Sequence, residues 1–202
     1  YEKSYKNLKK FATSLKNQTD NDFDLIILND RINKFSTDLL NKLNFKIFKT
    51  KGTINKIRIE LINYCKRMKY KNIIFVDSDD SVDKKRVELS KKYLIKNNIV
   101  VNELNIFSKN NKLIYKNYFS KRISNKFKFR NNELLDKNFL GLTNTSLNTN
   151  ILKNQNLNKL NKAPIFDWAF WYMLLKNNTG IFISETHTNY INIFNSLTSF
   201  TT

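Results

Sequence analysis

The strongest constraint on the fold is an apolar segment that ends in a cluster of carboxylates. Residues 72–76 read Asn-Ile-Ile-Phe-Val, a continuous run of the kind that is buried on both faces of a parallel sheet. Asp77, Asp79 and Asp80 follow directly. Because ligands bind at the carboxyl ends of strands in open α/β sheets, this junction is the first candidate for a functional site.

The first half of the chain alternates helical and strand patterns, which is typical of βαβ units. Apolar residues at the helical spacing predict one helix over residues 2–16 and another after Thr53, whose side chain can cap it. A further helix is predicted at about 31–42. The predicted strands are 22–28, 45–48 and 72–76. We therefore expect an α/β fold with a mostly parallel central sheet.

The pattern changes from about residue 99 onward. Two apolar runs at 100–107 and 112–115 flank a polar turn, which predicts a small antiparallel hairpin in the second half. A helix containing residues 167–175 is so apolar that it must be largely buried. Gly180 is expected to mark the end of this helix, before a strand at 181–184.

Length and cysteine usage narrow the class of protein. A chain of 202 residues with 41% hydrophobic content is long enough for one domain with a two- or three-layer core. Its apolar runs are far shorter than the roughly 18 residues of a membrane-spanning helix, so we expect a soluble domain. The single cysteine, Cys65, excludes an internal disulfide and favours a reducing compartment. We expect a cytoplasmic protein.

The formal net charge of +19 would attract polyanions. Lys and Asn are abundant along the whole chain, so the charge is expected to cover all solvated faces. The basic segment 118–132, predicted to be a loop, interleaves Phe127 and Phe129 with its charges. We expect peripheral contact with the anionic inner face of a membrane rather than binding of nucleic acid.

The acidic cluster has the composition of a divalent cation site. Residues two apart in extended backbone project to the same side, so Asp77 and Asp79 can face one ligand, while Asp80 points away or engages a neighbouring loop. Clustered carboxylates repel one another, which makes Mg²⁺ or Mn²⁺ a natural partner. The alternative is a solvated turn in which Asp80 or Ser81 caps a helix beginning near Val82.

Three segments resemble the motifs of family 2 glycosyltransferases with the GT-A fold, in the expected order. Residues 70–80 resemble the strand and DxD-type motif, and residues 15–30 resemble the first helix, the following turn and the second strand. Residues 166–168, Phe-Asp-Trp, resemble the acidic motif that opens a helix and supplies the catalytic base. The resemblance covers about residues 1–195.

The resemblance implies a fold and an activity. The fold would be a Rossmann-like three-layer sandwich forming a single domain over 1–202, with a nucleotide-binding half at 1–97 and an acceptor half at 98–202. The activity would be transfer of a sugar from a nucleotide-diphospho-sugar to the hydroxyl of a glycan or lipid-linked acceptor, in surface glycan or polysaccharide synthesis. Family members normally begin with a strand before the first helix, whereas here the helix starts at once. By this resemblance we expect either that the strand has been cut away or that the nucleotide pocket is incomplete.

The resemblance also implies roles in binding the donor. Asp30, with Asn29 beside it, would contact the nucleotide base. Asp77 would contact the ribose or diphosphate, supported by Asp80, and Asp79 together with Asp77 would hold Mn²⁺ or Mg²⁺.

The chemical step would depend on Asp167, which would deprotonate the acceptor hydroxyl; a lone base implies inversion of configuration. Asp167 could instead be a buried helix cap. Arg58 could reach the diphosphate or be a solvated helix charge. His187 is a candidate metal ligand or a solvated loop histidine.

Two other functions fit parts of the sequence. An aspartyl phosphotransferase would use Asp77 as nucleophile and Asp79 as its acid partner, but it would also need a downstream Lys and a second acidic pair. A basic module that binds polyanions without catalysis would leave the acidic cluster a structural role.

Overall fold

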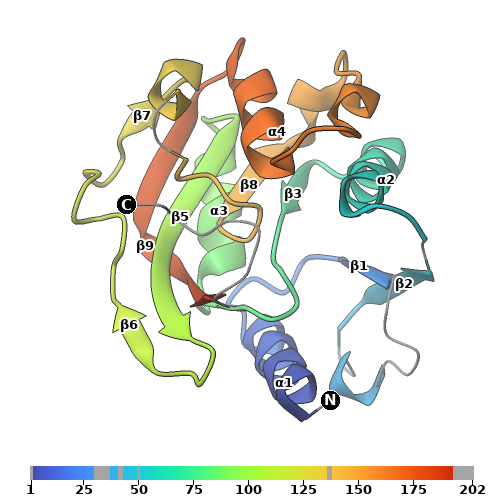
Figure 1. The fold of residues 1–202 in the computed structure, drawn as a ribbon, viewed down its shortest axis with the longest axis vertical. Helices are drawn as coiled ribbons and strands as arrows, with labels where there is room; N and C mark the ends of the chain where they lie inside the picture. Colours follow the sequence, from blue (N-terminus) through green and yellow to red (C-terminus); the bar gives the residue numbers. More distant parts are fainter. Residues whose placement is uncertain (1, 30–36, 41–42, 50, 136–137, 193–202) are drawn as a thin grey trace.

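The computed structural model describes residues 2–29, 37–40, 43–49, 51–135 and 138–192. Figure 1 shows helices on both sides of a central sheet. The α-helices of the described residues are α1 (Glu2–Lys16), α2 (Ile54–Arg67), α3 (Arg86–Leu94) and α4 (Phe166–Leu175). Short 3-10 helices are η1 (Thr37–Leu40), η2 (Asn131–Leu134), η3 (Thr149–Leu152) and η4 (Leu157–Leu160).

The strands form two separate sheets in the described residues. A parallel pair consists of β1 (Leu25–Asn29) and β2 (Phe45–Lys49). A larger sheet has the order β3-β8-β5-β9-β4, with β6 added to β5 and β7 added to β9. Its strands are β3 (Asn72–Ile74), β4 (Ser81–Val82), β5 (Ile99–Ser108), β6 (Leu113–Tyr115), β7 (Lys128–Phe129), β8 (Thr145–Asn148) and β9 (Gly180–Asn192).

The expectation of a mostly parallel sheet is confirmed only in part. In the larger sheet, β5 and β9 are parallel, whereas the pairs β3–β8, β5–β8, β5–β6, β4–β9 and β7–β9 are antiparallel. β9 follows β5 in parallel along its whole length, with a register shift opposite Asn102 and Glu103. The short strands β7 and β4 pair with β9 in the opposite direction, β7 at Gly180 and Ile181 and β4 at Thr188 and Asn189.

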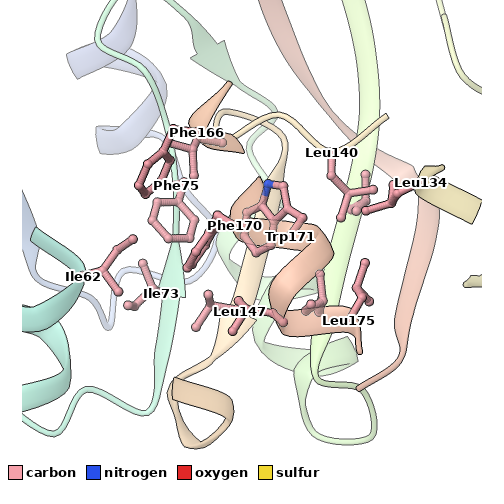
Figure 2. Close-up of a cluster of buried hydrophobic side chains, with 14 of the residues drawn as sticks. Ile62, Ile73, Phe75, Leu134, Leu140, Leu147, Phe166, Phe170, Trp171 and Leu175 are labelled. Carbon is pink, nitrogen blue, oxygen red and sulfur yellow. The ribbon is translucent and has the colours of Figure 1, made fainter. Parts of the chain in front are cut away.

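The hydrophobic core lies on both faces of the larger sheet, which makes the molecule a three-layer sandwich. Val101 and Ile99 of β5 pack into the cluster that contains α4, whereas Val100 between them packs with Leu89 and Leu94 of α3. This alternation follows from the two-residue period of a strand. Figure 2 shows the first cluster, in which Phe170 and Trp171 of α4 lie against Phe75.

The helices agree closely with the sequence-based predictions. α1 has the predicted bounds, and the Thr53 side chain caps α2 by accepting a hydrogen bond from the Lys56 amide. α4 is buried as expected, and β5 and β6 form the predicted hairpin. The helix predicted at about 31–42 falls largely outside the described residues. The described part of this range, residues 37–40, forms the short helix η1.

Two local predictions are wrong. No helix begins near Val82, because Ser81–Val82 forms β4 and the following helix starts at Arg86. Gly180 does not end α4, whose last residue is Leu175. Gly180 opens β9 opposite Phe129, and an added Cβ would lie 2.2 Å from the Phe129 ring, so only glycine leaves room for that side chain.

None of the helices in the described residues is long and apolar enough to cross a membrane.

Candidate functional site

The site is built around the turn that follows β3. The Phe75 amide still donates to the carbonyl of Thr145 on β8, and the Asp77 amide donates to Thr143 Oγ1 at 3.4 Å. The Asp80 amide then donates to the Asp77 carbonyl at 3.1 Å. These contacts close a turn in which Asp77 is exposed, Asp79 is half-buried and Asp80 is buried.

Asp80 points into the protein rather than toward a ligand. It is 1% exposed, and its carboxylate accepts hydrogen bonds from Thr143 Oγ1 at 2.7 Å and from the Ile191 amide at 2.9 Å. Burial, reinforced by the charges of Asp79 and Asp77, raises the pKa of Asp80 well above its usual range. Asp80 thus engages a neighbouring loop, as the sequence analysis allowed, and anchors the turn to β9. Its role in cofactor binding stays a prediction.

Asp77 faces the open side of the turn. Its side chain is exposed to a cavity whose wall also includes Arg58 and Leu142. Dense protein surroundings raise the pKa of Asp77 to about 6; Arg58 opposes this rise, and the charges of Asp167 and Asp79 add to it. These couplings bring four predicted site residues into one electrostatic neighbourhood. A carboxylate that titrates near neutrality and lies in a cavity is a candidate for binding or catalysis.

Asp167 lies in the first turn of α4, across from Asp77. Its Oδ1 forms an ion pair with Arg58 Nη1 at 2.8 Å, and its Oδ2 accepts a hydrogen bond from the Leu142 amide at 3.2 Å. Burial raises the pKa of Asp167, while Arg58 and the Leu142 amide lower it. The Arg58 guanidinium also lies 5.5 Å from the centre of the Phe166 ring. The structure thus gives Arg58 an ion-pair partner on α4.

Asp79 is half-buried, and burial raises its pKa. His187 is not gathered with Asp77 and Asp79, because it lies on β9 and lines another cavity, of about 750 Å³, with Lys6, Lys9 and other polar residues. Across the described part of the chain, no group of three or more His, Cys, Asp or Glu is placed to hold a metal ion. The predicted three-residue metal set is therefore not assembled.

The predicted base-binding residues are only partly visible. Asn29 is the last residue of β1, and Asp30 lies outside the described residues. The segments that lead into β1 and β3 are joined, because Tyr70 Oη donates to Asp24 Oδ2 at 2.5 Å. This bond raises the pKa of the Tyr70 phenol.

The loop at 141–144 contributes contacts that the sequence analysis missed. Leu142 supports Asp167 through its amide, and Thr143 supports both Asp77 and Asp80 through its hydroxyl. The Gly141 amide donates to Asn144 Oδ1 at 2.9 Å, which closes the loop into a tight turn. In the sequence, the isolated Gly141 is the signal that could have indicated a turn at this loop.

Comparison with known families assigns the chain to a family. The sequence pattern described as glycosyl transferase family 2 matches residues 1–153. The chain belongs to glycosyl transferase family 2. No match is found among curated proteins.

Solved structures similar to this family 2 chain have the GT-A fold. S. aureus TarS 1-349 in complex with UDP-GlcNAc has a TM-score of 0.71 and 16% identity, covering 99% of this chain and 59% of its own. Its complex with UDP has a TM-score of 0.69 and 17% identity, covering 94% and 57%. GalNAc-T7 with UDP, GalNAc and Mn2+ has a TM-score of 0.67 and 11% identity, covering 95% and 41%. The present chain thus spans about two fifths to three fifths of these relatives.

Proposed function

We propose that the chain is a glycosyltransferase that binds a nucleotide-diphospho-sugar beside Asp77 and transfers the sugar to an acceptor hydroxyl. The observation that carries the proposal is that Arg58, which lines a cavity together with Asp77, forms an ion pair with Asp167, and that the charges of all three are coupled although they come from three separate elements. An aspartyl phosphotransferase would need a lysine and a second acidic pair there, and the cation that contacts Asp167 is an arginine. We assign nucleotide binding to residues 1–97 and acceptor binding to residues 98–202.

Asp167 is the general base of this proposal. Its carboxylate takes the proton of the acceptor hydroxyl while the acceptor oxygen bonds to the anomeric carbon and the bond to the diphosphate breaks. Arg58 and the Leu142 amide hold the carboxylate in one orientation. A single base without a second nucleophilic carboxylate predicts inversion at the anomeric carbon.

The carboxylates suit a hard divalent cation, although they do not form a complete cage. Asp77 is exposed to the cavity and Asp79 is half-buried, and Mg²⁺ or Mn²⁺ is commonly held by one or two carboxylates plus substrate phosphates. Asp79, with Asp77, would hold the ion. When bound, it would supply positive charge to the departing diphosphate. His187 lies in another cavity and has no part in this proposal.

The donor that we test first is a UDP-linked N-acetylamino sugar, since TarS was solved with UDP-GlcNAc and GalNAc-T7 with UDP, GalNAc and Mn2+. Thermal unfolding would be followed with UDP, GDP, CDP and UDP-GlcNAc, each with and without Mn²⁺. A ligand that binds only the folded state raises the melting temperature. At a ligand concentration of about 100 times Kd, the free energy of unfolding rises by about 2.7 kcal/mol. We expect a shift with one nucleotide that depends on Mn²⁺.

Matched variants test the proposed roles of Asp79 in metal-dependent binding and of Asp167 in transfer. Asp79→Asn should abolish the Mn²⁺-dependent part of the shift, whereas Asp38→Asn, at an exposed position on η1, should leave it unchanged. Asp167→Asn should keep the shift but remove transfer. If no nucleotide shifts the wild-type protein with metal present, the transferase proposal fails for this chain.

We further propose that the acceptor is a glycan or lipid-linked molecule in surface glycan or polysaccharide synthesis, reached at an anionic membrane. The supporting observation is β6, whose Leu113, Ile114 and Tyr115 are all exposed, while Lys121 lies 6.0 Å from the Tyr115 ring. Such an apolar edge beside lysines suits the interface of an anionic bilayer. Co-sedimentation with phosphatidylglycerol vesicles should be lost in Ile114→Asp and absent with phosphatidylcholine vesicles.

A further inference from the structure

A second cavity, of about 750 Å³, lies between α1 and the paired strands β4 and β9. We call it the lysine groove. Its basic lining residues are Lys6, Lys9, Lys10, Lys84 and His187. Neither Asp77 nor Arg58 lines it, so it is distinct from the cavity that the donor is proposed to occupy.

One face of α1 carries the lysines of the first wall. Residues three or four apart in a helix share a face, and Lys6, Lys9 and Lys10 are spaced in this way. The opposite face of α1 packs into the core, with Leu8 and Leu15 buried. The remaining basic residues come from the facing wall. The positive side chains therefore surround a hollow, rather than covering one convex helix surface.

The positive charge of the groove is not neutralised by its own carboxylate. Asp83 lines the groove, but its Oδ1 already accepts hydrogen bonds from the Lys85 amide at 2.9 Å and from Thr186 Oγ1 at 3.4 Å. Lys10 Nζ donates to the neutral Asn111 Oδ1 at 2.6 Å. Across the described residues, none of the four groove lysines forms an ion pair with a carboxylate. Ammonium groups gathered in this way attract an anion.

The uncharged polar residues of the groove suit phosphate in particular. Thr13 and Asn17 are exposed on the α1 wall, and Asn189 Nδ2 donates to Ser81 Oγ at 3.3 Å on the facing wall. Phosphate oxygens accept hydrogen bonds from ammonium, hydroxyl and amide groups together. Lysine binds phosphate as a point charge, whereas a planar carboxylate is matched best by the fork of an arginine, and no arginine is among the described residues that line the groove.

The groove begins directly after the acidic turn. Ser81, which follows Asp80 in the chain, lines it and pairs with Asn189 across β4 and β9. Val82 lines both the groove and the cavity beside Asp77, so the two are neighbours. A ligand held in the groove therefore lies next to the site that we propose for the donor.

We propose that the lysine groove is a second anion-binding site, which holds phosphate groups of a ligand other than the donor and needs no divalent cation. Lysines on both walls of one cavity, without carboxylate partners among the described residues, carry the inference. A soluble phosphorylated ligand and the headgroup of an anionic lipid both supply this chemistry. The inference does not rest on the transferase activity, because no lysine of the groove is assigned to transfer.

The test uses inorganic tripolyphosphate as the probe, with EDTA present to exclude divalent cations. Binding is measured by calorimetry at low salt, and the accessibility of each lysine is measured by amine-reactive labelling and mass spectrometry. At about ten times Kd, labelling of Lys6, Lys9 and Lys84 should slow about tenfold, because only the free protein reacts. This readout uses the wild-type protein.

Two triple variants with the same change in net charge show whether the groove itself binds. The groove variant carries Lys6→Gln, Lys9→Gln and Lys84→Gln. The control variant carries Lys153→Gln, Lys159→Gln and Lys162→Gln. All six side chains are exposed, and Figure 1 shows residues 153–162, in orange, at the opposite end of the molecule from α1. We expect the groove variant to bind tripolyphosphate about tenfold more weakly and the control variant less than about twofold more weakly.

Phosphatidylglycerol vesicles distinguish the two sources of phosphate. Protection of the three labelled groove lysines by these vesicles, and not by phosphatidylcholine vesicles, would assign the groove to a lipid headgroup. Protection by tripolyphosphate alone would assign it to a soluble ligand. The proposal is overturned if neither probe protects these lysines. It is also overturned if both triple variants lose the same affinity, because the attraction is then a property of the overall charge.

A variant of the proposed donor site keeps the two sites apart. Asp79→Asn should bind tripolyphosphate as tightly as the wild type, because Asp79 does not line the groove. A loss of binding in Asp79→Asn would place the phosphates in the donor site and would overturn the proposal. The Mn²⁺-dependent thermal shift with nucleotides is measured separately, so a failure of the groove remains distinct from a failure of the proposed activity.

Discussion

Replacing Arg58 should move the pH dependence of catalysis in a defined direction. Arg58 Nη1 lies 2.8 Å from Asp167 Oδ1, with 27% and 17% of the two side chains exposed. At about 4 Å between charge centres and an effective dielectric constant of about 20, the attraction is about 4 kcal/mol, equal to about three pKa units. Since both groups are partly solvated, we expect about one to two units in practice.

The sign follows from the protonation state that the reaction needs. Asp167 must be ionised to act as a base, and burial already raises its pKa while Arg58 lowers it. Arg58→Met should therefore raise this pKa further and move the acidic limb of the kcat/KM profile upward by about one to two pH units. Activity should recover toward wild type at high pH. Arg58→Lys keeps the charge and should shift the limb by less than half as much.

Donor hydrolysis or transfer would be measured between about pH 4.5 and 9, with kcat and KM separated. If Arg58 instead contacts the diphosphate alone, KM rises at all pH values and the limb stays in place. A second readout needs no activity. Because the folded pKa of Asp167 rises further in Arg58→Met, the loss of unfolding free energy relative to wild type should be largest at neutral pH and shrink toward about pH 4. The assignment of Arg58 as the residue that lowers the pKa of Asp167 would be wrong if the acidic limb of the kcat/KM profile stayed in place and the stability difference between Arg58→Met and wild type did not depend on pH.

Four further outcomes are expected. Asp80→Ala should lower the unfolding free energy by about 2–4 kcal/mol, seen as a melting temperature lower by about 5–15 °C, because two buried donors lose their acceptor; a surface role for Asp80 would leave the melting temperature unchanged. Since its folded pKa is raised, the stability that Asp80 contributes should decline as the pH rises above the ordinary range of an aspartate, and Asp80→Asn should flatten that part of the stability curve. Glu103→Gln should cost about 2–4 kcal/mol in urea unfolding, because its carboxylate accepts from the amides of Leu104, Phe119 and Ser120 and an amide nitrogen would face a donor; an unchanged midpoint would contradict this network. Cys65, whose thiol pKa is raised to about 11 by burial, should react with Ellman's reagent slowly in the folded protein and rapidly in urea, and equal rates would show that the thiol is accessible.

Local patterns in the sequence were sufficient for most helices and for the place of the site. The spacing of apolar residues predicted the bounds of α1, the Thr53 cap of α2 and the buried helix α4. The apolar run at 72–76 correctly placed the carboxylates at a strand end. These features depend on residues within one or two turns of each other, so the sequence alone carries them.

The direction of strand pairing could not be predicted in the same way. The strands β5, β8 and β9 come from distant parts of the chain, and nothing in their composition distinguishes a parallel from an antiparallel neighbour. The packed structure places β9 parallel to β5 on one side and β8 antiparallel to it on the other.

The roles within the acidic cluster were also decided by tertiary structure. Asp79 and Asp80 are neighbours of the same type, yet only Asp80 meets Thr143 and Ile191, which lie 63 and 111 residues away in the chain. From the sequence, Arg58 could equally be a solvated helix charge and Asp167 could be a helix cap, and only the fold pairs these two residues, which are 109 positions apart. The sequence determined which chemistry is present and at which strand end, because those are local properties. The two-residue period of extended backbone already predicted that Asp80 would point away from Asp77 and Asp79. Its partners, and the cation that faces Asp167, depend on contacts that exist only once the distant segments have packed.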